Sequence, residues 1–300
     1  MNPYVQVVNT CLLGEAPHWS ERTQSLYYVD TEGTAVHRYD PVTRDHTKAT
    51  IAGLGSVSLI VPVAGEVDKY VITTGRELQV LEWDGKDDRP LSLEPILSVD
   101  EPFPNNSFND GKCDAMGRLW AGSVNPFALP NASLYKVDHG IGTTMESDIR
   151  ISNGIAWSND NTLMFYIDTA TRRVDVFDFD ETDGTISNRR TVYNFNTVGE
   201  LGSPDGMTTD VNGHLYVACF GGSQVIKIDP EQGTKIGSIR FPTFNITSVM
   251  FGGANLDTLF VTSAQSGLSQ PILVSQPMAG ATFQVTNLSA RGHSANEYNL

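Results

Sequence analysis

The chain has 300 residues, 40% of them hydrophobic, and a formal net charge of −15. This acidic balance excludes nucleic acid as an expected partner, because binding a phosphate backbone requires a basic surface. No stretch is long and apolar enough for a transmembrane helix, so we expect no membrane partner either.

The N-terminal region and the cysteines indicate a cytoplasmic protein. The first 19 residues lack the basic start and the continuous apolar core of a signal peptide. Cys11, Cys113 and Cys219 are an odd number and have no metal-type spacing. We therefore expect free, buried thiols in a reducing compartment.

One short apolar pattern recurs six times along the chain. Each copy is rich in aromatic and β-branched residues, which is typical of a strand buried on both faces. The copies begin at Leu26, Tyr70, Leu119, Met164, Leu215 and Leu259. Most copies are followed, after a brief turn, by a second alternating segment, as in residues 35–40 and 173–180. This order predicts hairpins joined by short loops.

Six such units predict an all-β fold, a six-bladed β-propeller that spans residues 1–300 as one domain. A double β-sandwich would also explain the number of strands, but it would not explain the sixfold spacing. Residues 4–10 resemble a strand without a nearby hairpin partner. We expect this strand to lie beside residues 281–288, so that the two chain ends share the last blade.

A polar residue stands ten to twelve residues before each copy of the pattern, near the start of the strand expected to be innermost in its blade. These residues are Glu15, Ser58, Asn109, Asn153, Asp205 and Ser248. Equivalent positions on innermost strands face the central channel, so we expect Glu15, Asn109, Asn153 and Asp205 to converge there. Taken singly, Asn109 and Asp205 are also typical of turns.

A divalent cation would offset the cost of facing two carboxylates and two carboxamides toward one channel. Carboxylate and amide oxygens suit Ca²⁺, Mg²⁺ or Mn²⁺. Repetition in register therefore favours a metal site in the channel over a set of unrelated turns.

Several segments together resemble the regucalcin (senescence marker protein), gluconolactonase and luciferin-regenerating enzyme family, with an insect-like character. They are "GEAPHW", "FNDGKCDAMGRLWAGS", "ISNGIAWSNDNTLMFYID", "SPDGMTTDVNGHLYVA" and "ITSVMFGGANLDTLFVTS". The resemblance covers nearly the whole chain. It implies a six-bladed propeller with one divalent ion in the channel, Ca²⁺ foremost, with Zn²⁺, Mg²⁺ and Mn²⁺ as alternatives.

The resemblance also implies roles for single residues. Glu15, Asn153 and Asp205 match the metal ligands of the family, and Asp205 matches its catalytic acid/base. Asn109 matches a substrate-contacting position. Ser107 stands where many relatives carry a substrate-contacting arginine, so the surroundings of the substrate are expected to differ from those in such relatives.

The implied activity is metal-dependent hydrolysis of a lactone, such as gluconolactone, or of a related ester bond. The partner is then a small-molecule substrate, and a monomer is expected because a propeller closes without a second chain. Three alternatives stay open. They are a luciferin-regenerating type of reaction, hydrolysis of phosphotriesters on the same scaffold, and a non-catalytic calcium-binding or regulatory protein.

Overall fold

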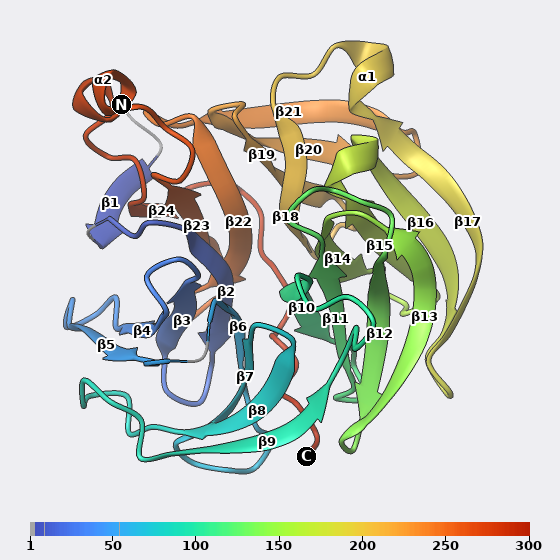
Figure 1. Cartoon of the computed structure of the whole chain (residues 1–300). Coiled ribbons are helices and arrows are strands. Elements are labelled where there is room, and N and C mark those ends of the chain that lie inside the picture. The colour runs from blue at the N-terminus through green and yellow to red at the C-terminus, as the bar shows by residue number, and fades with distance from the viewer. Residues whose placement is uncertain (1–3, 9, 54) are drawn as a thin grey trace.

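A computed structural model describes residues 4–8, 10–53 and 55–300, and its strands form six four-stranded sheets arranged in a ring (Figure 1). The strands of each blade are given from the innermost to the outermost. Blade 1 consists of β2 (Gly14–Ser20), β3 (Ser25–Asp30), β4 (Ala35–Tyr39) and β5 (His46–Thr50). Blade 2 consists of β6 (Val57–Pro62), β7 (Lys69–Thr74), β8 (Glu77–Glu82) and β9 (Ser92–Ser98), and blade 3 consists of β10 (Ser107–Cys113), β11 (Leu119–Val124), β12 (Ala132–Asp138) and β13 (Ile141–Ile149).

Blades 4 to 6 follow the same inside-to-outside order. Blade 4 consists of β14 (Ser152–Trp157), β15 (Leu163–Asp168), β16 (Arg173–Asp180) and β17 (Thr185–Asn194). Blade 5 consists of β18 (Ser203–Thr209), β19 (Leu215–Phe220), β20 (Gln224–Asp229) and β21 (Thr234–Arg240). Blade 6 consists of β22 (Asn245–Gly252), β23 (Thr258–Ala264), β24 (Thr282–Val285) and β1 (Tyr4–Val8). The predicted six-bladed propeller is confirmed, and the recurring apolar pattern is the second strand of every blade.

The last blade contains the first and the last strand of the chain, but the expectation that both chain ends share it is wrong for the C-terminus, because Leu300 lies 3.3 Å from His139 of blade 3. Strand β1 pairs antiparallel with β24, and Tyr4 lies opposite Val285. The predicted pairing of the two terminal strands is confirmed, although residue 9 of the predicted strand lies outside the described residues. The ring is therefore closed by backbone hydrogen bonds between the first and the last strand.

Helix is scarce in the part of the chain that the structure describes. It is limited to α1 (Phe195–Val198), α2 (Gln270–Ser275) and one 3₁₀ turn, η1 (Thr169–Thr171). Within the described ranges, none of these helices has the length and apolar character needed to cross a membrane.

Aromatic side chains pack the contacts between neighbouring blades. Trp120 of blade 3 lies edge-on to Trp157 and Phe179 of blade 4, at ring distances of 6.4 and 5.8 Å. Trp19 of blade 1 stacks on Phe260 of blade 6 at 5.6 Å. These tryptophans are buried, so they form part of the hydrophobic core at both contacts.

All six innermost strands are interrupted at the same level by a shift in pairing register. The shifts lie between Glu15 and His18, Val57 and Ile60, Phe108 and Gly111, Ser152 and Ile155, Pro204 and Met207, and Ile246 and Val249. Such bulges leave residues unpaired and turn their side chains in a new direction. The six polar positions predicted from register lie in or directly beside these bulges.

A segment after the last strand crosses the middle of the ring (Figure 1). Val211 donates its backbone N–H to Arg291, Tyr298 donates to Pro62, and Asn299 donates to Gly117, at 2.9 Å each. The segment thus ties blades 5, 2 and 3 together across one end of the channel. No repeat or motif in the sequence predicts this crossing.

Candidate metal centre

Three carboxyl groups from three different blades, those of Glu15, Asp110 and Asp205, lie close enough at the level of the bulges to affect one another's ionisation. Burial raises the pKa of Glu15 well above its usual range, and the nearby carboxylates of Asp205 and then Asp110 raise it further. Burial followed by the charge of Asp110 raises the pKa of Asp205 well above its usual range as well. The effect of the Asp205 charge on Glu15 indicates that these two residues, 190 positions apart in the chain, are electrostatic neighbours.

The two predicted carboxamides are joined to each other in the same layer. Asn109 Nδ2 donates to Asn153 Oδ1 at 3.2 Å and to the Ser152 carbonyl at 2.8 Å. Asn153 Nδ2 donates to Thr169 Oγ1 at 2.9 Å, and the Thr169 hydroxyl donates to the Pro204 carbonyl, next to Asp205. The amide of Asn153 therefore presents its oxygen, rather than its nitrogen, on the side of Asn109.

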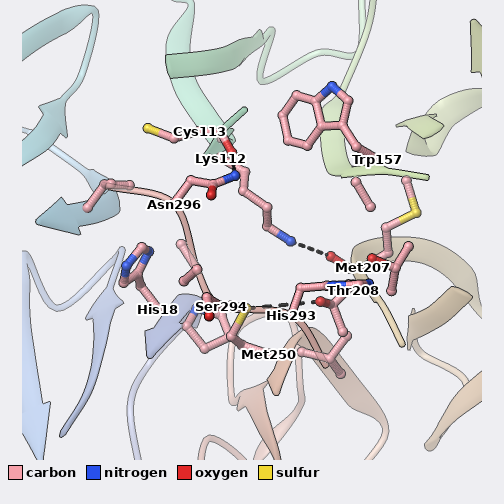
Figure 2. Close-up of a pocket in the computed structure, with 18 of the residues that line it drawn as sticks. His18, Lys112, Cys113, Trp157, Met207, Thr208, Met250, His293, Ser294 and Asn296 are labelled. Atoms are coloured by element: carbon pink, nitrogen blue, oxygen red, sulfur yellow. Dashed lines mark hydrogen bonds between the residues drawn. The ribbon is translucent and has the colours of Figure 1, made fainter. Parts of the chain in front are cut away.

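A lysine that the register pattern does not single out lies beside these groups. Lys112 Nζ donates to the Met207 carbonyl at 2.9 Å (Figure 2). Burial lowers the pKa of Lys112 to about 8, although the neighbouring carboxylate of Asp110 opposes this effect. When all four groups are ionised, one ammonium against three carboxylates leaves two negative charges, which is the charge that a divalent cation neutralises.

Asp110 and Lys112 are thus members of the candidate site that the sequence analysis missed. Both belong to the Asn-Asp-Gly-Lys segment, in which the register pattern singles out only Asn109. The bulge between Phe108 and Gly111 breaks the alternation that would otherwise send Asn109 and Asp110 to opposite faces of the sheet. The Asn-Asp-Gly-Lys motif could have identified Asp110 and Lys112 as members of the site, whereas the alternation of side chains along a regular strand could not.

Close approach of neighbouring inner strands at this level requires glycine. A Cβ added to Gly154 would lie 2.7 Å from the Asp205 carbonyl oxygen and 2.8 Å from the Met207 backbone nitrogen. Real Cβ atoms do not approach backbone atoms so closely, so the absence of a side chain at Gly154 lets blade 4 carry Asn153 up to Asp205.

The other predicted positions serve different contacts. Ser58 donates its hydroxyl to the Phe108 carbonyl at 2.7 Å and so joins blade 2 to blade 3. Ser248 is buried, and its backbone N–H donates to Thr262 Oγ1. Ser107 opens β10 opposite Val124 and is partly exposed, two residues before Asn109.

A cavity of about 220 Å³ follows the bulges along the channel. Its walls are the later halves of the inner strands, and residues 293–296 of the crossing segment also line it (Figure 2). Asp110 and Lys112 line it, whereas Glu15, Asn153 and Asp205 do not. Asp110 therefore connects this cavity with the other two carboxylates.

The donor atoms in this layer suit a hard cation. Two carboxylates and one carboxamide oxygen, from Glu15, Asp205 and Asn153, match the oxygen donors that Ca²⁺ and Mg²⁺ prefer. The negative charge and its burial give such an ion a favourable place, because buried carboxylates without a compensating charge are costly. These three residues could hold a divalent metal.

The chain is similar to proteins of one family over nearly its whole length. Residues 13–265 match the SMP-30/Gluconolactonase/LRE-like region. Regucalcin of Danio rerio is 37% identical over 285 residues, which cover 93% of this chain and 92% of that protein. A solved luciferin-regenerating enzyme superposes with a TM-score of 0.93 at 37% identity and 99% coverage of both chains.

A more distant structure shares the fold. The calcium-binding protein regucalcin from Agrobacterium tumefaciens superposes with a TM-score of 0.90 at 23% identity, covering 98% of this chain and 97% of that one. The match of residues 13–265 and the identity to regucalcin are consistent with a lactonase-type enzyme. The chain therefore belongs to the SMP-30/gluconolactonase/LRE-like family, as its motifs predicted.

Proposed function

We propose that the protein hydrolyses a lactone, with a sugar lactone such as gluconolactone as the first substrate to test, and that a divalent cation held by Glu15, Asn153 and Asp205 is required. The observation that carries this proposal is the group of carboxylates from separate blades, with Lys112 as their cationic neighbour. A folded protein retains such a costly group when an ion or a reaction uses it.

The donor set favours Ca²⁺ as the ion. Glu15, Asp205 and Asn153 offer hard oxygen donors and no imidazole or thiolate, which favours Ca²⁺, Mg²⁺ or Mn²⁺ over Zn²⁺. Ca²⁺ also tolerates irregular geometry and additional water ligands, whereas Mg²⁺ demands a near-ideal octahedron.

A divalent ion bound here would polarise the lactone carbonyl and acidify a nearby water. Asp205 accepts a proton from the attacking water while the new carbon–oxygen bond forms. The ring carbon–oxygen bond then breaks, and Asp205 returns the proton to the ring oxygen, which leaves as a hydroxyl. Asn109, anchored on Ser152 and Asn153, would orient the substrate beside this proton transfer.

Ser107 bears on which lactone is accepted. A serine hydroxyl cannot reproduce the fixed, charged fork of donors that a guanidinium offers to a polyhydroxylated substrate. We therefore infer weaker binding of sugar lactones than in relatives that carry arginine at this position, with the hydrolytic groups kept.

The second candidate is a reaction of the luciferin-regenerating type. It is favoured by the 37% identity and 0.93 TM-score to a solved luciferin-regenerating enzyme. Hydrolysis of phosphotriesters and calcium binding without catalysis are the remaining alternatives, and one substrate panel separates all four.

The test combines metal removal with paired variants. Protein treated with a chelator should lose gluconolactone hydrolysis, and Ca²⁺ should restore it. Asp205→Asn and Glu15→Gln should each lower kcat by at least about 100-fold, whereas Glu21→Gln, an exposed carboxylate just after the same strand as Glu15, should not. Full turnover after exhaustive chelation, or in both site variants, would refute the proposal.

A further inference from the structure

A group of ligand-type side chains lies apart from the channel, at the first blade. Cys11 precedes β2, Asp30 ends β3, and His37 lies in β4. One ligand atom of each residue, a sulfur, a carboxylate oxygen and a ring nitrogen, lies within 4.8 Å of the other two. All three residues are buried, and Cys11 is only 2% exposed.

His37 has a ring nitrogen without a partner at this place. Its Nδ1 lies 2.9 Å from His46 Nε2, whereas its Nε2 is buried without a hydrogen-bond partner among the described residues. His37 is 5% exposed, and the ring of Tyr28 stacks on it at 4.7 Å. If Nδ1 donates its proton to His46, Nε2 carries a free lone pair.

Asp30 is already fixed by the backbone. Its carboxylate accepts the N–H groups of Leu12 and Leu13 at 3.0 Å and of Gly33 at 2.9 Å. Each carboxylate oxygen can accept more than one hydrogen bond, and Oδ2 receives only the Leu12 bond among these three. Oδ2 therefore has a lone pair beyond the one that accepts the Leu12 bond.

Blade 4 shows that this backbone role of Asp30 requires neither the cysteine nor the histidine. Asp168 occupies the equivalent position and accepts the N–H groups of Arg150 and Ile151 in the same way. The residue that corresponds there to Cys11 is the buried Ile149. An ordinary apolar side chain thus satisfies the packing around this aspartate.

The position of His37 also has a counterpart in blade 4. His37 pairs with Tyr28 across β3 and β4, and Asp175 pairs with Tyr166 across β15 and β16. Asp175 is fully partnered, because Arg189 Nε binds it at 2.9 Å and the Thr191 hydroxyl donates to it at 2.8 Å. Blade 1 thus keeps a thiol and an imidazole with one unpartnered nitrogen where blade 4 keeps an isoleucine and a closed ion pair.

We propose that Cys11 Sγ, His37 Nε2 and Asp30 Oδ2 bind a zinc-type ion at a site independent of the channel and of the proposed lactonase activity. Thiolate and imidazole donors favour Zn²⁺ and similar ions over Ca²⁺. Neighbouring ligand atoms around a tetrahedral zinc are about 3.3–3.8 Å apart, so side-chain adjustments of about 1 Å would bring the three donors to zinc spacing, with a water molecule as the fourth ligand. The thiol proton is released to solvent when the ion binds.

The position of the site suggests what the ion does. The Cys11 N–H donates to the Gly280 carbonyl at 2.8 Å, so the segment before β2 already contacts blade 6. An ion bound by Cys11, Asp30 and His37 fastens this segment to blade 1. The ion would thereby stiffen the segment through which blade 1 contacts blade 6, where Leu12 and Leu13 also pair with residues 264–266.

Cobalt spectroscopy tests the site without reference to activity. The chelated full-length protein is unfolded and refolded with one equivalent of Co²⁺, which should give a thiolate-to-cobalt charge-transfer band and the visible bands of tetrahedral Co²⁺. Cys11→Ser should lose the charge-transfer band. Cys113→Ser, which removes another buried thiol, should keep it. The oxygen donors of the channel cannot produce this band, so a failed lactonase proposal would leave the result unaffected.

Two outcomes overturn the site. One is a wild-type protein that gives no charge-transfer band, and the other is a band that persists in Cys11→Ser. If Cys11→Ser does not fold, His37→Gln keeps the thiol and should weaken Co²⁺ binding at least tenfold. Unchanged Co²⁺ affinity in His37→Gln would also refute the assignment.

Discussion

Replacing Asp205 with asparagine should change stability in opposite directions with and without the metal. In the metal-free protein, burial and the charge of Asp110 raise the pKa of Asp205 above its value in the unfolded chain. A carboxyl group with a raised folded-state pKa favours folding at low pH, and this stability is lost as pH rises through the folded-state pKa. At neutral pH the ionised Asp205 therefore destabilises the metal-free fold.

The magnitude follows from proton linkage. Each unit by which the folded-state pKa exceeds the unfolded one lowers the free energy of unfolding by about 1.4 kcal/mol at neutral pH. Asp205→Asn keeps the shape and removes the charge, so it should stabilise the chelated protein by an amount of that order. In domains of 150–250 residues, 1 kcal/mol corresponds to a melting-temperature shift of about 2–4 °C.

Calcium should reverse this ranking. A ligand at 100 times its dissociation constant stabilises the folded state by about 2.7 kcal/mol, and Asp205→Asn forfeits this gain because it removes a proposed ligand. Melting curves of wild type and Asp205→Asn, each with chelator and with excess Ca²⁺, should therefore cross. Glu21→Gln, at an exposed site, should follow wild type in both conditions. A wild type that is more stable than Asp205→Asn in chelator as well as in Ca²⁺ would refute the reasoning.

Three further predictions test single structural features. Gly154→Ala places a Cβ 2.7 Å from the Asp205 carbonyl and should lower Ca²⁺ affinity at least tenfold by calorimetry, whereas Gly237→Ala, whose Cβ would meet its nearest neighbour at 3.7 Å, should not. Ala16 has a φ of +46°, so Ala16→Gly should raise the free energy of unfolding by about 0.5–1 kcal/mol in urea; a loss of stability would contradict this. Trp120→Ala should cost about 3–5 kcal/mol in the same assay, because Trp120 is fully buried between two blades.

The architecture could be predicted because a physical constraint repeats along the chain. A sheet that must bury both faces leaves a continuous apolar run, and six such runs at similar spacing indicate six equivalent sheets. The pairing of Tyr4 with Val285 could be expected for a related reason, since a strand without a local partner must find one elsewhere. All three cysteines are free and buried, as predicted.

The candidate site could be predicted only in part. The shared offset from the recurring apolar pattern predicted that Glu15 and Asp205 lie near each other. The alternation of side chains along a strand could not reveal that a bulge carries Asp110 to the same layer. The crossing segment that ends near Asn299 is held by backbone hydrogen bonds and by single side chains such as the buried Tyr298, and neither forms a periodic pattern that a sequence could reveal. The roles assigned to Asn109, Ser107 and the metal ligands stay predictions, as do a monomeric state and a cytoplasmic location.

The equivalent bulges separate the chemistry of the channel from the stability of the fold. Each inner strand carries one polar residue in or beside its bulge at the predicted register, and these six positions hold Glu15, Asn109, Asn153, Asp205 and two serines in this chain. The apolar second strands of the blades are buried whichever polar side chains the bulges carry. We therefore expect a single exchange at this level to change substrate binding while the ring is kept. The serine at position 107 lies outside the proposed ligand set and two residues before Asn109 in the same strand, so we expect the same of this exchange.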